Sequence, residues 1–287
     1  MQKIRKAVFP VAGYGTRMLP ATKAIPKEML TLIDKPLIQY AVEEAINSGI
    51  EQIVFVTGRS KKSLEDHFDI NVELNKTLWD TGKTKLYEDM KRISEMVDII
   101  YVRQKEQQGL GHAILCAKEI VKNEPFAVIL PDDIILAGTP VIGQLIHQYE
   151  RAGGSVVSLM PVSEQHAHRY GIVEIDTRLD DRLYKLKDMV EKPKDTPPSD
   201  LAIIGRYILM PEIIDLLETV RPDKGEIQLT SALHLAATKG HVFGYEFEGK
   251  RFDCGNKEGL LEATLHFAAA NHELKPELIR IISELNL

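Results

Sequence analysis

Short apolar runs alternate with helical patterns in the first third of the chain. Residues 4–11 form a β-branched, apolar run that breaks at Gly13 and Gly15, and residues 52–56 form a second run. Between them, apolar residues recur with helical spacing from 36 to 46, and Gly49 ends the pattern. Continuous apolar runs are typical of strands that are buried on both faces of a parallel sheet and covered by helices. The pattern therefore predicts an α/β fold.

A polar stretch interrupts this alternation. Residues 61–97 have a helical period and contain the only tryptophan, Trp79. We interpret them as a helical excursion from the sheet, with a structural or intersubunit role rather than a catalytic one. Beyond it the alternation resumes, and the pattern predicts strands at 98–103, 126–130 and 155–162 and helices at 109–121 and 140–151.

The pattern changes again after residue 162, where shorter strands and turns follow. Strands are predicted at 171–175, 183–191, 201–209 and 241–247, and helices at 211–219, 228–239, 257–271 and 276–285. Residues 192–200 contain Pro193, Pro197 and Pro198 and form a loop. We find no internal repeat. We therefore expect residues 1–287 to form a single domain, with a Rossmann-like, mixed, mostly parallel sheet flanked by helices and with β-rich insertions.

Composition narrows the class of protein. The chain has 287 residues, of which 44% are hydrophobic and 27% are charged, and these values exclude a disordered protein. Its two cysteines, Cys116 and Cys254, cannot form a disulfide scaffold and suit a reducing cytosol. No apolar run approaches the roughly 20 residues that a membrane-spanning helix needs. We expect a cytoplasmic protein without a membrane partner.

The formal charge of -6 argues against nucleic acid as a general partner. It does not argue against small anionic ligands, because a few cations gathered in one cleft can reverse the local field. The position of the cations therefore carries more information than their total.

The loop after the first strand is the first candidate for such a cleft. A glycine-rich turn between a strand and a helix exposes backbone N–H groups to which a phosphate can bind. Met18 stands where a dinucleotide-binding fingerprint needs its third glycine, and the P-loop ending is missing, so both of those classes are disfavoured. A tight turn without a ligand is the alternative. Because Arg17, Lys23 and Lys27 follow directly, the segment suits a polyphosphate.

Two later segments carry further candidate chemistry. Asp132 and Asp133 end an apolar strand, where a carboxylate is well placed to hold Mg²⁺, although a cap or turn aspartate is an equally good interpretation. Asp253, at the end of another strand-like segment, could complete such a site. Glu191 and Lys192 precede the proline loop, either as an exposed ion pair or with the lysine binding the phosphate of a second substrate.

Several motifs together resemble a known family. The run from Ala12 to Pro20, Ala-Gly-Tyr-Gly-Thr-Arg-Met-Leu-Pro, is followed by Pro-Lys-Glu-Met-Leu at 26–30. Further similar segments lie at 109–113, 130–133, 170–174, 191–193, 225–230 and 252–255. This set, in this order, is similar to bacterial UTP–glucose-1-phosphate uridylyltransferases, within the sugar-phosphate nucleotidyltransferases. Thr31 and Ser231 depart from the family pattern, where a proline and an aspartate are commoner.

The resemblance covers nearly the whole chain and implies a fold of the nucleotide-diphospho-sugar transferase type. It implies Mg²⁺-dependent transfer of UMP from UTP to glucose 1-phosphate, with UDP-glucose and pyrophosphate as products. Residues 1–162 would form a nucleotide-binding half, 163–255 a sugar-binding half and 256–287 C-terminal helices. A homodimer or homotetramer is expected.

The resemblance also implies roles for single residues. The catalytic cations would be Arg17, Lys27 and Lys192. The nucleotide would be bound by Ala12, Gly13, Gly15, Thr16, Glu28, Gln104, Gly109 and Asp132, with Glu28 and Gln104 reading the uracil edge. The sugar phosphate would contact Gly171, Glu191, Lys192 and Gly205. Mg²⁺ would be held by Asp132 and Asp253, with Asp133 as a substitute for Asp132.

Two alternatives remain open at this point. A glucose-1-phosphate thymidylyltransferase shares the loop, the aspartates and the Glu-Lys-Pro element, so only base and sugar selectivity separate it. A non-catalytic, nucleotide-binding regulatory relative is the second alternative. The presence of Lys27, Asp132, Lys192 and Asp253 argues against it.

Overall fold

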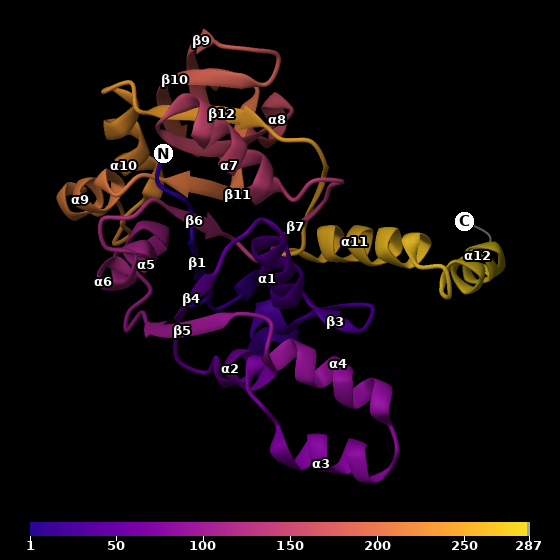
Figure 1. Cartoon of the computed structure of the whole chain (residues 1–287). Helices are drawn as coiled ribbons and strands as arrows, with labels where there is room; N and C mark the ends of the chain where they lie inside the picture. Colours follow the sequence, from indigo (N-terminus) through magenta and orange to yellow (C-terminus); the bar gives the residue numbers. More distant parts are fainter. Residues whose placement is uncertain (286–287) are drawn as a thin grey trace.

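The computed structural model describes residues 1–285 and has a nine-stranded sheet at its centre (Figure 1). The strand order is β5-β4-β1-β6-β11-β8-β12-β10-β9. The strands are β1 (Lys6–Pro10), β4 (Gln52–Thr57), β5 (Asp98–Arg103), β6 (Phe126–Ile129), β8 (Ser155–Pro161), β9 (Gly171–Arg178), β10 (Leu183–Glu191), β11 (Leu201–Leu209) and β12 (Val242–Glu246). Two small sheets pair β2 (Thr31–Leu32) with β3 (Lys35–Pro36), and β7 (Asp133–Leu136) with β13 (Lys250–Asp253).

The sheet is mixed, as the sequence predicts, but it is not mostly parallel, because antiparallel pairs are as numerous as parallel ones; most of the parallel pairs lie at one end. β5, β4, β1 and β6 run parallel to one another, whereas β11 is antiparallel to both β6 and β8. β8 and β12 form one more parallel pair, and β10 is antiparallel to β12 and β9. All residues of β11 are buried. Because β11 pairs with β6 on one side and with β8 on the other, the strands before and after it belong to one continuous sheet.

The apolar runs are buried on both faces of the sheet, which confirms the interpretation of their pattern. Within β1, Val8 packs into one hydrophobic cluster, and Ala7 and Phe9 pack into the cluster on the opposite face. Successive side chains of a strand point to opposite faces, so a strand covered on both sides must be apolar throughout.

Helices cover both faces of the sheet. The side chains of α1 and α7 pack with Phe9, and those of α5, α9 and α10 pack with Val8. The helices are α1 (Leu37–Asn47), α2 (Lys62–Phe68), α3 (Val72–Asp80), α4 (Thr84–Ser94), α5 (Gly109–Cys116), α6 (Lys118–Val121), α7 (Val141–Ala152), α8 (Glu164–Ala167), α9 (Glu212–Thr219), α10 (Leu229–Ala237), α11 (Lys257–Ala270) and α12 (Lys275–Glu284). Three 3₁₀ turns, η1 (Thr16–Met18), η2 (Ala21–Lys23) and η3 (Lys27–Met29), follow the first strand.

Some elements differ from those predicted. The helix expected at 109–121 is two helices, α5 and α6, joined at Ala117, and β9 runs to Arg178 rather than to residue 175. The pattern did not reveal β7 because its partner, β13, comes from a distant part of the chain, and a pairing of that kind leaves no local signal. Residues 286–287, the end of the C-terminal segment expected at 256–287, lie outside the described residues.

Two helical pairs project from the body of the molecule, α3 with α4 and α11 with α12 (Figure 1). Both carry exposed apolar side chains, among them Val72, Trp79, Leu261 and Ile279. Neither α4 nor α12 buries a residue. Within residues 1–285, no helix is long and apolar enough to cross a membrane.

Candidate active site

The glycine-rich loop lies at the carboxyl end of β1. Gly15 has a φ of 67°, and a Cβ there would lie 3.0 Å from the Lys27 Cβ, so this position requires glycine. A Cβ on Gly13 would meet nothing nearer than the Lys27 Cε, at 4.0 Å. Ala12 is buried, whereas Thr16 is exposed at the start of η1. The loop therefore leaves open space beside Gly13, where a phosphate can approach backbone N–H groups.

Lys27 and Asp132 bring η3 and the end of β6 together. The Lys27 Nζ donates to the Asp132 Oδ2 at 2.6 Å. Burial alone would raise the pKa of Asp132, but Lys27 and the more distant Arg17 hold it below its usual range. Asp132 in turn raises the pKa of Lys27, against the effect of burial. Both groups are therefore charged at neutral pH.

The short sheet of β7 and β13 brings Asp253 to the same place. Asp253 pairs in register with Asp133, and the backbone N of Cys254 donates to the Asp132 carbonyl at 2.8 Å. The Arg17 guanidinium lies between the two predicted metal ligands, 3.8 Å from the Asp132 Oδ2 and 3.7 Å from the Asp253 Oδ2. Two aspartates far apart in the sequence thus face one cation.

Gly255 is closely packed against both carboxylates and against Arg17, whose Nη2 would lie 2.5 Å from a Cβ there. A Cβ on Gly255 would lie 2.6 Å from the Asp132 Oδ2 and 3.1 Å from the Asp253 Oδ1. Mg²⁺ takes one or two carboxylates and completes its oxygen shell with phosphate and water, so this pair fits the ion. No His, Cys, Asp or Glu within residues 1–285 joins the pair to make a cluster of three.

Asp133 is an anchor for Arg251. Its Oδ1 accepts a hydrogen bond from the Arg251 Nε at 2.6 Å, and its Oδ2 accepts one from the Gly205 backbone N at 3.1 Å. Arg251 also donates to the Tyr170 hydroxyl at 3.0 Å. Burial would lower the pKa of Arg251, but Asp133 and Asp253 raise it above its ordinary value. Both oxygens of Asp133 are engaged, which leaves Asp132 as the better placed metal ligand.

Glu28 and Gln104, the residues expected to read the uracil edge, are buried. The Glu28 Oε2 accepts from the Lys61 Nζ at 2.8 Å, and its Oε1 has no partner among the described residues. Burial raises the pKa of Glu28, while Lys61 and Lys27 oppose the rise. The Gln104 Nε2 donates to the Gly109 carbonyl at 3.3 Å. Both side chains are closed off from solvent in this structure, and their role in reading the base stays a prediction.

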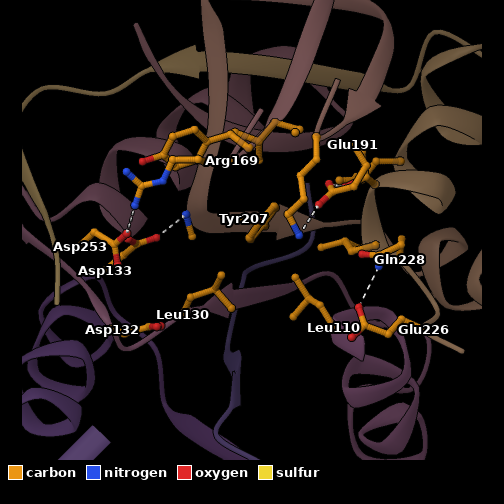
Figure 2. A pocket seen from close by; sticks show the side chains of 18 of the residues that line it. Leu110, Leu130, Asp132, Asp133, Arg169, Glu191, Tyr207, Glu226, Gln228 and Asp253 are labelled. Carbon is orange, nitrogen blue, oxygen red and sulfur yellow. Dashed lines mark hydrogen bonds and ion pairs between the residues drawn. The ribbon is translucent and has the colours of Figure 1, made fainter. Parts of the chain in front are cut away.

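A cavity of about 600 Å³ opens beside the aspartates (Figure 2). It is lined by the four residues expected to contact the sugar phosphate, together with Arg17, Asp132 and Asp253. The Lys192 Nζ lies 3.3 Å from the Glu191 Oε1. Figure 2 shows Glu191 on the opposite side of the cavity from Asp253. Gly205 is tightly packed, since a Cβ there would lie 2.6 Å from the Asp133 Oδ2.

Four side chains at or near this site were missed by the sequence analysis. The Arg169 Nη2 lies 3.6 Å from the Asp253 Oδ2, and the Thr230 hydroxyl donates to the Glu191 Oε2 at 2.6 Å. Arg169 and Arg251 each lie next to a motif identified in the sequence, so the sequence could have indicated that they belong to the site. Thr230 ends a motif to which no role was given. Lys61 carried no signal, because it begins a polar stretch in which lysines are common.

Comparison with known proteins places the chain in a family. The family model described as "Nucleotidyl transferase" matches residues 6–270. A "UTP--glucose-1-phosphate uridylyltransferase" from Bacillus subtilis (strain 168) is 50% identical over 287 residues, which cover 99% of this chain and 98% of that protein.

Solved structures agree with the sequence match. A UDP-glucose pyrophosphorylase complexed with UDP-glucose has a TM-score of 0.85 and 44% identity, covering 94% of this chain and 100% of that one. A UTP-bound UGPase from Acinetobacter baumannii has a TM-score of 0.91 and 41% identity, covering 99% of this chain and 100% of that one. The predicted fold class is therefore confirmed.

Proposed function

Because the chain belongs to the nucleotidyl transferase family, we propose that it is a UTP–glucose-1-phosphate uridylyltransferase, which makes UDP-glucose and pyrophosphate from UTP and glucose 1-phosphate. One observation carries the proposal. Arg17 and Lys192 line the cavity that Asp132 and Asp253 also line, Arg17 lies near both aspartates, and Lys27 is bonded to Asp132. The relatives that share this fold are named for this reaction and for its substrates.

The site suits an in-line nucleotidyl transfer, in which UMP passes from UTP to the sugar phosphate and both substrates are anions. An oxygen of the sugar phosphate attacks the α-phosphorus of UTP, and pyrophosphate leaves from the opposite side. The nucleophile is already an anion, so the protein needs no general base. Its tasks are to overcome the repulsion between the substrates, to stabilise the charge of the transition state and to hold the partners in line.

Each group of residues has a task in this scheme. The open loop at Gly13 receives the phosphates of UTP, and Arg17 and Lys27 neutralise them. Lys192 holds the sugar phosphate, and Glu191 accepts hydrogen bonds from sugar hydroxyls. Asp132 and Asp253 would hold Mg²⁺, which supplies further positive charge to the reacting phosphates when it is bound. The strands up to β8 thus frame the nucleotide, and β9 to β13 frame the sugar.

The net charge of -6 is compatible with these anionic substrates because of where the cations lie. Besides the three catalytic cations, Arg169 and Arg251 also line or border the cavity. These cations lie among the carboxylates that line the same cavity, Asp132, Asp133, Glu191, Glu226 and Asp253, so bound Mg²⁺ would supply the surplus of positive charge. The acidic remainder of the surface disfavours binding to nucleic acid.

A pyrophosphate-release assay tests the proposal. Purified protein is given UTP or dTTP with glucose 1-phosphate, with and without Mg²⁺. We expect release with UTP that depends on the metal and yields UDP-glucose. A preference for dTTP would replace the proposal with the thymidylyltransferase alternative. No release with any nucleotide and any sugar phosphate would restore the regulatory alternative.

A homodimer or homotetramer is part of the proposal. The exposed apolar side chains of the two projecting helical pairs, such as Trp79 and Ile279, support it, because water-exposed side chains of this size favour association. Light scattering after size exclusion measures the mass; a monomer at micromolar concentration would contradict the expectation.

Cys116 and Cys254 form no disulfide, which is what we expect of a protein in the reducing cytosol.

A further inference from the structure

The segment 225–230 is a family motif without an assigned role, and it contacts both sides of the cavity. On the nucleotide side it is bonded to the start of α5 through its backbone. The Ile227 N donates to the Gln108 carbonyl at 2.8 Å, and the Gly111 N donates to the Ile227 carbonyl at 2.9 Å. Gly109 has a φ of 89°, and a Cβ there would lie 2.9 Å from the Glu226 Cβ. This end of the segment is therefore fixed against the nucleotide half.

The other end of the segment reaches the sugar side. Thr230 lies in the first turn of α10, next to Leu229, which is buried in the main core. Its hydroxyl donates to the Glu191 Oε2 at 2.6 Å, and Thr230 lines the cavity. A hydroxyl on a helix that is packed into the core is a rigid donor, and a charge-assisted hydrogen bond is among the stronger kinds.

Glu191 has a second neighbour that competes for it. The Lys192 Nζ lies 3.3 Å from the Glu191 Oε1, so Thr230 and Lys192 contact different oxygens of one carboxylate. A lysine side chain is long and flexible, and without the Thr230 bond the carboxylate is free to turn towards it. Such a turn would withdraw from the cavity both the group that accepts sugar hydroxyls and the group that holds the phosphate.

We propose that Thr230 is a positioning residue for sugar selection, which fixes the Glu191 carboxylate so that its remaining lone pairs face the cavity and Lys192 stays available to the sugar phosphate. The inference rests on the proposed function and deepens it. An ionised carboxylate offers about four acceptor positions, and Thr230 uses one of them. The segment 225–230 supports this arrangement because it fixes the start of α10 to the nucleotide half.

The test is the Thr230→Val variant, which keeps the shape of the side chain and removes the hydroxyl. We expect the KM for glucose 1-phosphate to rise about tenfold or more, since hydrogen bonds to charged groups have that magnitude. The KM for UTP should stay within about twofold, because the lost bond lies on the sugar side of the cavity, whereas kcat should fall because Lys192 turns away from the sugar phosphate together with the carboxylate. The preference for glucose 1-phosphate over galactose 1-phosphate should fall about tenfold.

Matched variants separate positioning from structure. Thr230→Ser keeps the hydroxyl and should retain wild-type kinetics. Thr238→Val, past the end of the same helix, removes a hydroxyl that bonds only to the Leu235 carbonyl and should also behave as wild type. In a Glu191→Ala background, which leaves no acceptor for the Thr230 hydroxyl, adding Thr230→Val should change the KM for glucose 1-phosphate little. Calorimetry with UDP-glucose gives the same comparison without turnover.

Several results would overturn the inference. These are an unchanged KM and sugar preference in Thr230→Val, an equal loss in Thr230→Ser, or a parallel rise of the KM for UTP. If Thr230→Val does not fold, Thr230→Ala gives the same measurement without crowding. A wild-type protein that makes no UDP-glucose would instead count against the proposed function, so the two failures are distinguishable.

Discussion

Lys27 and Glu28 are neighbours in the chain, yet they belong to two ion pairs in opposite surroundings. Lys27 and Asp132 meet at 2.6 Å with 19% and 15% of their side chains exposed. Glu28 and Lys61 meet at 2.8 Å with 0% and 6% exposed. The distance between the charged atoms is nearly the same in the two pairs, but their exposure to solvent differs. At the first pair a phosphate can displace the carboxylate from the lysine, whereas the second pair is closed within the protein. Under the proposed function the first pair would serve catalysis, whereas the second is placed to stabilise the fold.

The largest expected effect is the loss of stability when the buried pair of Glu28 and Lys61, the closed pair, is broken. Lys61→Met leaves a buried Glu28 without its partner, and breaking a buried pair in this way costs about 3–5 kcal/mol of unfolding free energy. Urea unfolding measures the loss. Lys62→Met is the control, because the Lys62 side chain is 84% exposed and its loss should cost less than about 0.5 kcal/mol. Equal stability of the two variants would show that the buried pair contributes nothing.

The open pair should respond in the opposite way. Lys27→Met should lower the turnover of UTP and glucose 1-phosphate by about 10²–10³-fold, since it removes a donor from the transition state. Its unfolding free energy should fall much less than that of Lys61→Met, because Arg17 remains near Asp132. Steady-state kinetics and urea unfolding on both variants test the contrast. Near-normal turnover would remove Lys27 from the catalytic group.

A smaller effect is expected beside the open pair, at Gly255. An added Cβ would lie 2.5 Å from the Arg17 Nη2 and 2.6 Å from the Asp132 Oδ2, so Gly255→Ala should displace both groups from their places beside the carboxylate pair. We expect the Mg²⁺ concentration for half-maximal activity to rise about tenfold, or about 1.4 kcal/mol. Binding of Mn²⁺, followed by electron paramagnetic resonance, should weaken in parallel. Gly138→Ala is the control, because a Cβ there meets nothing within 4 Å; equal metal binding in both variants would move the metal site elsewhere.

The smallest effect is a pH dependence of the closed pair. Burial raises the pKa of Glu28 in the folded chain, so folding favours its protonated form. Its contribution to stability is therefore greatest below the unfolded pKa of about 4.3 and falls as the pH rises from there towards the folded pKa. Glu28→Gln cannot titrate, and the stability difference between it and the wild type should change in that direction. Parallel stability–pH curves would contradict this sign.

The buried runs of the sheet could be predicted from the sequence because their signal is local. Residues 53–56 are apolar throughout, and in β4 they are buried. The position of Asp132 at the end of a strand followed from the same signal. The motifs then indicated which polar residues belong to one site, although not which side chains contact one another there.

The rest depends on contacts that no local pattern records. The pair of Glu28 and Lys61 joins residues 33 positions apart, and Lys61 lies in a stretch where a lysine is unremarkable. The engagement of Asp133 by Arg251 could not be foreseen either, because it needs the register of β7 against β13. Thr230 is similar, since its importance arises only from the direction in which α10 presents it.

The pairing of β7 with β13 has a consequence for the order in which the site forms during synthesis of the chain. The chain leaves the ribosome from its N-terminus, so Asp132 emerges early and Asp253 emerges after every strand of the central sheet, the last of which ends at Glu246. A nascent chain can therefore complete its sheet while it still lacks half of its carboxylate pair. Under the proposed function the carboxylate pair would be complete only once β13, which follows the last strand of the central sheet, has paired with β7.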